Sequence, residues 1–245
     1  MTKTTLFASF STGGWTFPLP RSRRSASAAD EYNNPMTERL LPLFPLQVVL
    51  FPRTEILFHI FEERYKEMIG ECLETGSEFG IVLVLEQGLA STGCTATVAQ
   101  LIRKFDDGRM DILVRGRRRF DLARLDQERS FLRGEPQFFD DDGGEVPPAD
   151  AKRQQALRLY QQVAEKLSSE RRKEPPPAPE AADPQLSFQI ASRLPVELTF
   201  RQLLLQLRSE TIRLERLIPY LEKMAAQLAR VSEVQAKAGS NGRAH

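Results

Sequence analysis

The chain has 245 residues, of which 41% are hydrophobic, and its 34 Lys and Arg nearly balance 33 Asp and Glu, for a net charge of +1. This balance excludes a protein that coats nucleic acid over its whole surface, and no run approaches the ~18 apolar residues of a membrane-spanning helix. Two Cys and two His are too few for a disulfide scaffold or a zinc cage, so we expect reduced thiols, no metal, no cofactor and a cytoplasmic protein.

Residues 1–36 are expected to be a disordered leader. Residues 1–29 contain no Asp or Glu and are rich in Arg, Ser and Thr. A secretory signal is not expected, because the apolar start is broken at Ser9. Two alternatives stay open: the leader is an organelle transit peptide, which would change the location, or the true start is Met36.

Residues 37–140 have the composition and periodicity that are typical of strands. The expected strands are 41–46, 48–51, 55–61, 79–85, 94–105, 110–115, 118–125 and 131–139. Pro42 and Pro45 indicate that the first of these is an edge strand or an extended entry segment. The uninterrupted apolar run 79–85 predicts the central strand, and Asp-Asp-Gly at 106–108 predicts a hairpin turn.

One helix is expected among these strands. Its apolar stripe repeats at helical spacing and consists of Phe61, Tyr65, Met68, Ile69, Cys72 and Leu73. Gly76 follows at the place where a left-handed C-cap is expected. Several short strands with one early helix predict a small, largely antiparallel barrel or curled sheet.

Residues 149–233 are predicted to form a helical subdomain after a solvated acidic loop at 140–145. Its expected features are a helix at about 150–169, a helix that starts at Asp183-Pro184, a capping box at Thr199–Gln202 and a last helix kinked at Pro219. The segment 174–184 holds five prolines and should be an extended, mobile loop. Residues 234–245 should form a disordered tail.

Several separate segments resemble the N-terminal, substrate-binding domain of Lon protease. They are Leu41–Pro52, His59–Tyr65, Gly93–Val98, Asp107–Arg109 and Leu113–Phe120. The resemblance is close from Leu41 to Phe139 and looser in the helical part. It implies an α+β fold, namely a PUA-like, mostly antiparallel pseudo-barrel with one early helix, followed by a C-terminal helical bundle.

The resemblance also implies a function. In complete Lon proteases this module recognises unfolded or damaged polypeptides for an attached ATPase and protease. This sequence has no Gly-x-x-x-x-Gly-Lys-Ser/Thr phosphate loop, and no segment resembles the Ser–Lys protease region. We therefore expect a stand-alone, non-catalytic module that captures unfolded or extended polypeptides in protein quality control, with Lon protease as a candidate partner.

One residue departs from the family's pattern. The family commonly has Gly after its Phe-Pro, whereas Arg53 follows Phe51-Pro52 here. The wider side chain is expected to alter the turn.

Candidate polypeptide-binding residues are Phe51, Leu57 and Phe58, which would line an exposed apolar groove. The alternative is that they belong to the core, because periodicity does not distinguish a groove from packing. The resemblance to the Lon domain is what favours the groove.

No catalytic residue is expected. His59 has no Ser, Cys or Asp partner at a suggestive spacing, and a single His on a strand is more often packed or hydrogen-bonded than catalytic. Glu62 and Glu63 are expected to be solvated charges on an exposed helix face.

The strongest charge feature is a basic cluster. On a regular strand Arg115, Arg117 and Arg119 project to one face, which suits a phosphate or an acidic partner. The alternative is a solvated outer strand whose arginines pair with nearby Asp, and we favour it because no aromatic residue interleaves the basic face. Nucleic acid is therefore not an expected partner, and a PUA-like nucleic-acid-binding protein is the alternative function.

Overall fold

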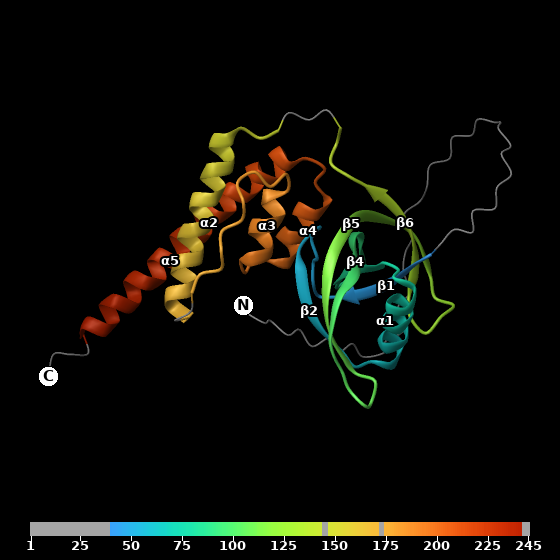
Figure 1. Ribbon diagram of the computed structural model, residues 1–245. Coiled ribbons are helices and arrows are strands. Elements are labelled where there is room, and N and C mark those ends of the chain that lie inside the picture. Colours follow the sequence, from blue (N-terminus) through green and yellow to red (C-terminus); the bar gives the residue numbers. More distant parts are fainter. Residues whose placement is uncertain (1–39, 144–146, 172–173, 242–245) are drawn as a thin grey trace. The chain divides into compact units, whose positions relative to one another are not determined.

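The structure, a computed structural model, describes residues 40–143, 147–171 and 174–241 (Figure 1). The expected leader, with Met36, lies outside these residues. Contacts divide the chain into a strand-rich unit that ends at Phe139 and a helical unit that begins at Asp140.

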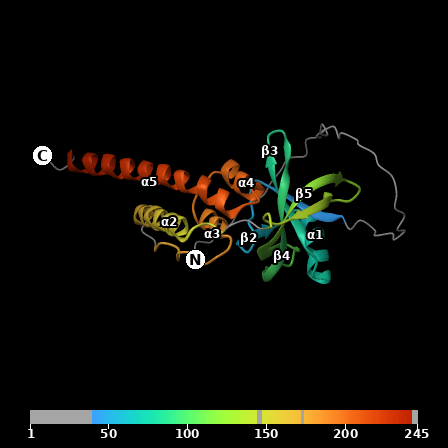
Figure 2. The ribbon, with the colours of Figure 1, turned by 90° about the horizontal axis from the view of Figure 1, so that it is seen from above.

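The strand-rich unit is a closed sheet with one strand appended. Its strands are β1 (Leu41–Leu46), β2 (Glu55–Ile60), β3 (Phe79–Leu85), β4 (Gly88–Lys104), β5 (Met110–Asp126) and β6 (Arg133–Phe139). The order is β2-β5-β4-β3-β1-β6, and β6 also pairs with β5, so five strands close a ring that β2 extends. Figure 2 gives a second view of this unit, with β2, β3, β4, β5 and α1 labelled. β1 and β3 are parallel and the other pairs are antiparallel. The predicted α+β class and the mostly antiparallel barrel are confirmed.

The prediction that β1 is an edge strand is wrong, because β1 lies between β3 and β6. Its first two residues pair with β6 and the next four with β3. The N–H of Leu43 points to the β6 side, where it donates to the Leu132 carbonyl at 2.8 Å. Because backbone groups alternate in direction along a strand, the nitrogen of Pro45 also faces β6, but at a residue that lies beyond the pairing with β6. The nitrogen of Pro42 faces β3, at a residue that lies before the pairing with β3 begins. Neither proline removes a ladder bond.

Two other strand predictions also need correction. Residues 48–51 are buried but do not form a strand, and the strands expected at 110–115 and 118–125 are one strand, β5. The hairpin predicted at 106–108 is confirmed, since it joins β4 to β5.

The early helix, α1 (Glu63–Thr75), buries four residues of the predicted stripe, namely Tyr65, Met68, Ile69 and Cys72. Leu73 is 39% exposed, and Phe61 is half-buried and precedes the helix. The left-handed cap is confirmed, because Gly76 has a φ of 65°. Phe44 of β1 joins the helix to the barrel: its ring lies 4.4 Å from that of Tyr65 on α1 and 5.7 Å from that of Phe58 on β2. These contacts place one core between α1 and the sheet.

A tight turn before β2 is docked on Gly116 of β5. The Phe51 carbonyl accepts the N–H of Thr54 at 3.3 Å and its hydroxyl at 2.8 Å. Arg53 N–H donates to the Gly116 carbonyl at 2.8 Å, and Gly116 N–H donates to the Thr54 carbonyl at 2.9 Å. Arg53 and Thr54 thus oppose the single residue Gly116, which makes a β-bulge. The first position of this type of bulge, here Arg53, usually holds a Gly in the left-handed conformation.

Gly116 permits this docking because it has no side chain. A Cβ there would lie 2.1 Å from the Phe51 carbonyl oxygen, far inside van der Waals contact. The position of the turn, and with it the start of β2, therefore depends on a glycine in the middle of an arginine run.

The helical unit contains α2 (Asp150–Arg171), α3 (Leu186–Arg193), α4 (Leu198–Gln206) and α5 (Glu210–Asn241). α2 packs along α5, and α3 contacts α2, α4 and α5. Pro219 lies inside α5, as expected, but the helix continues to Asn241, past the predicted start of the tail at 234.

Both predicted helix starts are displaced. α3 has Gln185 as its N-cap, because the Asp183 carboxylate accepts the Gln185 N–H at 2.8 Å in a turn before the helix. α4 has Glu197 as its N-cap and makes no side-chain cap bond, so the capping box at Thr199–Gln202 is wrong.

A buried arginine organises the helical unit. Arg213 on α5 is 0% exposed, and its two terminal nitrogens donate to both carboxylate oxygens of Asp141 at 2.6 and 2.5 Å. One of them also donates to the Leu207 carbonyl at 2.8 Å, and Nε donates to Glu210 at 3.0 Å. A buried charge is costly unless it is paired and hydrogen-bonded. Asp141 thus departs from the predicted solvated loop, because it is a partner of this charge.

Glu210 carries the network on to α3. The N–H and hydroxyl of Ser187 donate to its two oxygens at 2.8 and 2.7 Å. Burial raises the pKa of Glu210, and Arg213 and Ser187 oppose this rise. Asp141, the end of α4 and the starts of α3 and α5 are held by one set of bonds.

The first prediction concerns Gly116. Gly116→Ala should lower the free energy of unfolding of the strand-rich unit by about 2–3 kcal/mol, because the new methyl group displaces the 51–54 turn. The control is Gly70→Ala on α1, where a Cβ meets nothing within 4 Å and the better helix former should stabilise by about 0.5–1 kcal/mol. Urea unfolding followed by circular dichroism measures both, and a neutral Gly116→Ala would contradict the close approach.

The second prediction concerns Arg213. Arg213→Met leaves Asp141 and Glu210 without their cation and should destabilise the helical unit by about 3–5 kcal/mol. Arg216→Met, at an exposed position of the same helix, should change stability by no more than about 0.5 kcal/mol. Thermal unfolding of both variants tests this, and equal effects would show that the network contributes nothing specific.

Candidate functional site

β2 has an unpaired side. It pairs with β5 and with no other strand that the structure describes, in a regular register from Glu55↔Arg115 to Ile60↔Met110. Because Gly116 exchanges backbone bonds with the turn, alternation directs the amides of residues 56, 58 and 60 to β5. The backbone groups of Glu55 and Leu57 then face away from β5, and we call these groups the open edge.

A second unpaired edge exists on β4, where residues 98–104 extend beyond the pairing with β3. That edge carries Leu101 and Ile102, which are 41% and 46% exposed. Its register with β5 shifts between 98 and 100 and again between 101 and 103. Bulges of this kind disrupt a ladder and blunt an edge against strand pairing. The open edge of β2 is therefore the regular one.

The three predicted polypeptide-binding residues occupy different environments. Phe51 and Phe58 are 0% and 3% exposed, so they are core residues and do not line an exposed groove. Leu57 is half-buried on the outer face of β2 and lies opposite Leu113 of β5. Of the three, Leu57 is the one that an approaching chain can touch.

Two polar pairs flank these leucines on the same face. On one side, Arg115 pairs with Glu55 at 2.7 Å. On the other, His59 Nδ1 lies 2.6 Å from Asp111 Oδ1. No partner for His59 was expected from sequence spacing, because Asp111 comes from another strand, β5. An apolar centre with a polar rim is typical of a surface that binds another chain.

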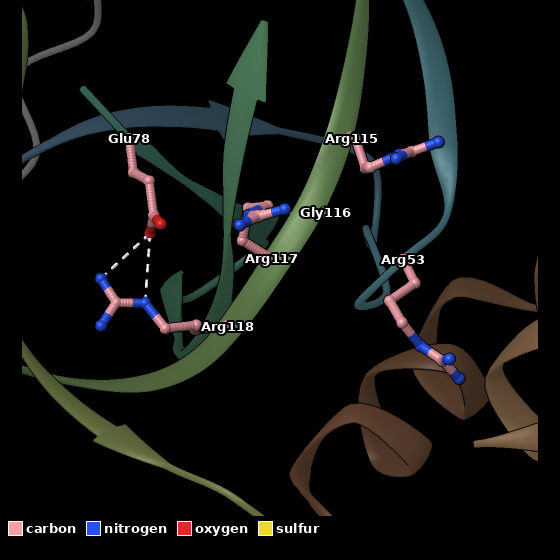
Figure 3. A pocket seen from close by; sticks show the side chains of 6 residues that line it. All are labelled: Arg53, Glu78, Arg115, Gly116, Arg117 and Arg118. Carbon is pink, nitrogen blue, oxygen red and sulfur yellow. Dashed lines mark hydrogen bonds and ion pairs between the residues drawn. The ribbon is translucent and has the colours of Figure 1, made fainter. Parts of the chain in front are cut away.

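A pocket of about 480 Å³ opens beside the start of β2. It is lined by Arg53, Glu78, Arg115, Gly116, Arg117 and Arg118 (Figure 3), and we call it the arginine pocket. Four guanidinium groups and one carboxylate give it a net positive charge, which attracts anions.

A second bulge shapes this pocket. The register passes from Cys94↔Arg119 to Ala96↔Gly116, so two residues of β5 oppose Thr95. The Thr95 hydroxyl accepts the N–H of Arg118 at 3.0 Å and donates to its carbonyl at 3.3 Å. The extra residue leaves both Arg117 and Arg118 exposed.

The bulge overturns one sequence expectation. Arg119 is 2% exposed and does not share the face of Arg115 and Arg117. Strict alternation predicted that Arg119 would lie on that face, but Arg118 is exposed there and Arg119 is buried. Gly116 was the available signal, because a glycine inside a strand often marks a bulge.

β6 places an aromatic ring beside the basic residues of β5, although no aromatic residue lies between these arginines in the sequence. Phe138 is 44% exposed, and the guanidinium of Arg118 lies 3.8 Å from its ring centroid. The sequence could not reveal this contact, since the two residues come together through the pairing of β5 with β6.

The arginines of the pocket differ in their partners. Arg118 pairs with Glu78 at 3.2 Å and is 55% exposed, and Arg115, paired with Glu55, is 54% exposed. The side chain of Arg117 makes no ion pair or hydrogen bond with any residue that the structure describes. Exposed pairs of this kind exchange readily because solvent screens them.

Neither thiol is poised for chemistry. Burial raises the pKa of Cys94 to about 12 and also raises the pKa of Cys72, so both remain protonated and unreactive. Within the described ranges, no three His, Cys, Asp or Glu side chains gather to hold a metal ion. Over the same ranges no helix has the length and apolar character to cross a membrane.

Comparisons with known proteins agree with this architecture. The family model of the ATP-dependent protease La (LON) substrate-binding domain matches residues 40–223. The crystal structure of a Lon N-terminal domain protein from Xanthomonas campestris has a TM-score of 0.57 at 26% identity, over 74% of this chain and 98% of that chain. The N-terminal domain of a Mycobacterium avium complex Lon protease has a TM-score of 0.54 at 16% identity, over 75% and 98%. This second likeness shows the fold alone.

The third prediction concerns Arg53, which has a φ of 59° where Gly is usual. Arg53→Gly should be more stable than Arg53→Ala by about 1 kcal/mol, because both remove the guanidinium and only Ala keeps the strained Cβ. Chemical unfolding of the two variants measures the difference. Equal stabilities would mean that the turn is not held in the left-handed conformation.

Proposed function

Because the chain belongs to the ATP-dependent protease La (Lon) substrate-binding domain family, we propose that it captures unfolded or extended polypeptides through the open edge of β2. It does so in protein quality control and without catalysis of its own. The observation that carries the proposal is the regular, unpaired side of β2. Strand addition to such an edge gives affinity through main-chain bonds, which every polypeptide can make.

The outer face of β2 adds apolar contact to these bonds. Leu57 and Leu113 lie in register, so an added strand would place alternate side chains beside Leu57. An apolar client side chain gains there by leaving water. Folded proteins hide such side chains and unfolded proteins expose them, which favours capture of unfolded clients.

This mode of capture serves two kinds of quality-control protein. A holdase keeps the client from aggregating, whereas an adaptor passes it to a Lon protease. Both require reversible binding without nucleotide. A pull-down from native lysate, scored for Lon protease and for unfolded clients, separates the two.

Nucleic-acid binding by the arginine-rich strand is the alternative function. Phe138 beside Arg118 favours it, because bases stack on exposed aromatic rings. Against it, the carboxylates of Glu55 and Glu78 lie on the same surface and pair with two of the arginines. We therefore place polypeptide capture first.

The fourth prediction tests strand addition with a labelled peptide of alternating apolar residues. Two isomers carry N-methyl groups on alternate amides, in opposite phase. Because an added strand uses only every second amide, the two isomers should differ in affinity by about tenfold or more. Fluorescence anisotropy measures binding, and equal affinities of both isomers would exclude strand addition.

Leu57→Ser should weaken binding of the unmodified peptide about threefold to tenfold by removing the apolar contact. The matched control is Leu101→Ser on the bulged β4 edge, which should bind as the wild type does. The wild type should also slow aggregation of a denatured client without ATP. No peptide binding, together with no effect on several clients, would overturn the proposed function.

A further inference from the structure

We propose that the arginine pocket binds carboxylates of acidic residues that lie next to the strand-forming segment of a captured polypeptide. The inference rests on the proposed function and specifies its clients: chains in which an apolar segment is followed, toward the C-terminus, by Asp or Glu.

Two backbone devices fix the pocket. The turn that docks on Gly116 carries Arg53 to the pocket's edge, and the bulge opposite Thr95 turns Arg117 and Arg118 outward together. Arg115 precedes both on the same strand. A short stretch of β5 thus presents three exposed guanidinium groups, which a regular strand would divide between two faces.

The charges of the pocket suit carboxylates. Arg115 and Arg118 each hold one already, from Glu55 and Glu78, so their guanidinium groups are presented in a geometry that accepts this group. Arg117 lies between them without a partner among the described residues. An incoming carboxylate would relieve the repulsion between neighbouring arginines.

The pocket lies at the beginning of β2. Arg115 pairs in register with Glu55, the first residue of that strand, and Arg53 precedes it by two positions. Antiparallel pairing is the more stable arrangement, and a strand added antiparallel to β2 ends where β2 begins. The residues that follow the paired segment of the client would therefore reach the arginines.

The same features disfavour a nucleic acid as the ligand. Single-stranded nucleic acids bind along grooves where basic residues follow the backbone and successive aromatic rings stack on bases. Here the basic residues form one pocket, and Arg118 covers one face of the ring that lies beside it, Phe138. Along the outer face beyond the pocket, the next polar pair is His59 with Asp111.

The test uses the full chain and three labelled peptides with one apolar core and blocked termini. One has Glu-Glu after the core, one has Glu-Glu before it, and one has Gln-Gln after it. The first should bind about tenfold tighter than the third in low salt, and this ratio should fall steeply at ~0.5 M salt. The peptide with Glu-Glu before the core should bind with nearly the same affinity as the Gln-Gln peptide.

In the double variant Arg117→Gln, Arg118→Gln, the ratio of the first affinity to the third should fall to about one. Arg103→Gln, at an exposed position of β4 outside the pocket, should keep the wild-type ratio. Circular dichroism confirms that both variants are folded.

The outcomes separate this inference from the proposed function. If the Gln-Gln peptide binds and the wild-type ratio is one, the pocket inference fails and polypeptide capture stands. An equal gain from Glu-Glu before the core would also overturn it, because it requires an antiparallel client. The pocket would be assigned to nucleic acid if single-stranded RNA bound in a salt-sensitive way, if the double variant lost this binding, and if the affinity ratio of the first peptide to the third were one. If none of the peptides binds, the proposed function itself fails.

Discussion

The close approach of the Phe51 carbonyl to Gly116 is the contact on which the candidate binding surface of the strand-rich unit depends. It docks the turn that starts β2, sets the phase of the β2–β5 ladder, and so decides which amides of β2 bond to β5 and which remain available. A side chain at residue 116 would occupy the place of the carbonyl. The same contact holds Arg53 in a conformation that costs a non-glycine residue about 1–2 kcal/mol.

The open edge and the arginine pocket follow from this one contact. The 51–54 turn leads directly into the first residue of β2, and β5 continues from Gly116 into Arg117 and Arg118. The open edge, which we propose pairs with client backbones, and the arginine pocket, which we propose binds client carboxylates, therefore lie side by side. Main-chain pairing alone discriminates poorly between clients, and an adjacent charged site adds selectivity with little loss of generality. In the helical unit, the hydrogen-bonded network around Arg213 holds Asp141, the end of α4 and the starts of α3 and α5 together.

The sequence predicted the fold class well, because barrel strands and amphipathic helices leave periodic patterns. The apolar stripe of α1 and the C-cap at Gly76 could be predicted for that reason, and the family resemblance covered the same region. What could not be predicted were features that depend on pairing between distant segments. A bulge reverses the alternation that placed Arg119 outside, β6 brings Phe138 to Arg118, and Asp141 meets Arg213 across the helical unit. Phe51 and Phe58 were assigned to a groove because apolarity does not distinguish a binding surface from a core.

Amide hydrogen exchange with and without a bound apolar peptide tests the central claim most directly. If clients add a strand to β2, the amides of Glu55 and Leu57, which face away from β5, should exchange more slowly in the complex because each becomes hydrogen-bonded. The amides of residues 56, 58 and 60 bond to β5 and should be protected in both states. Protection of residues 98–104 in place of Glu55 and Leu57, or unchanged exchange along β2 at saturating peptide, would contradict the account.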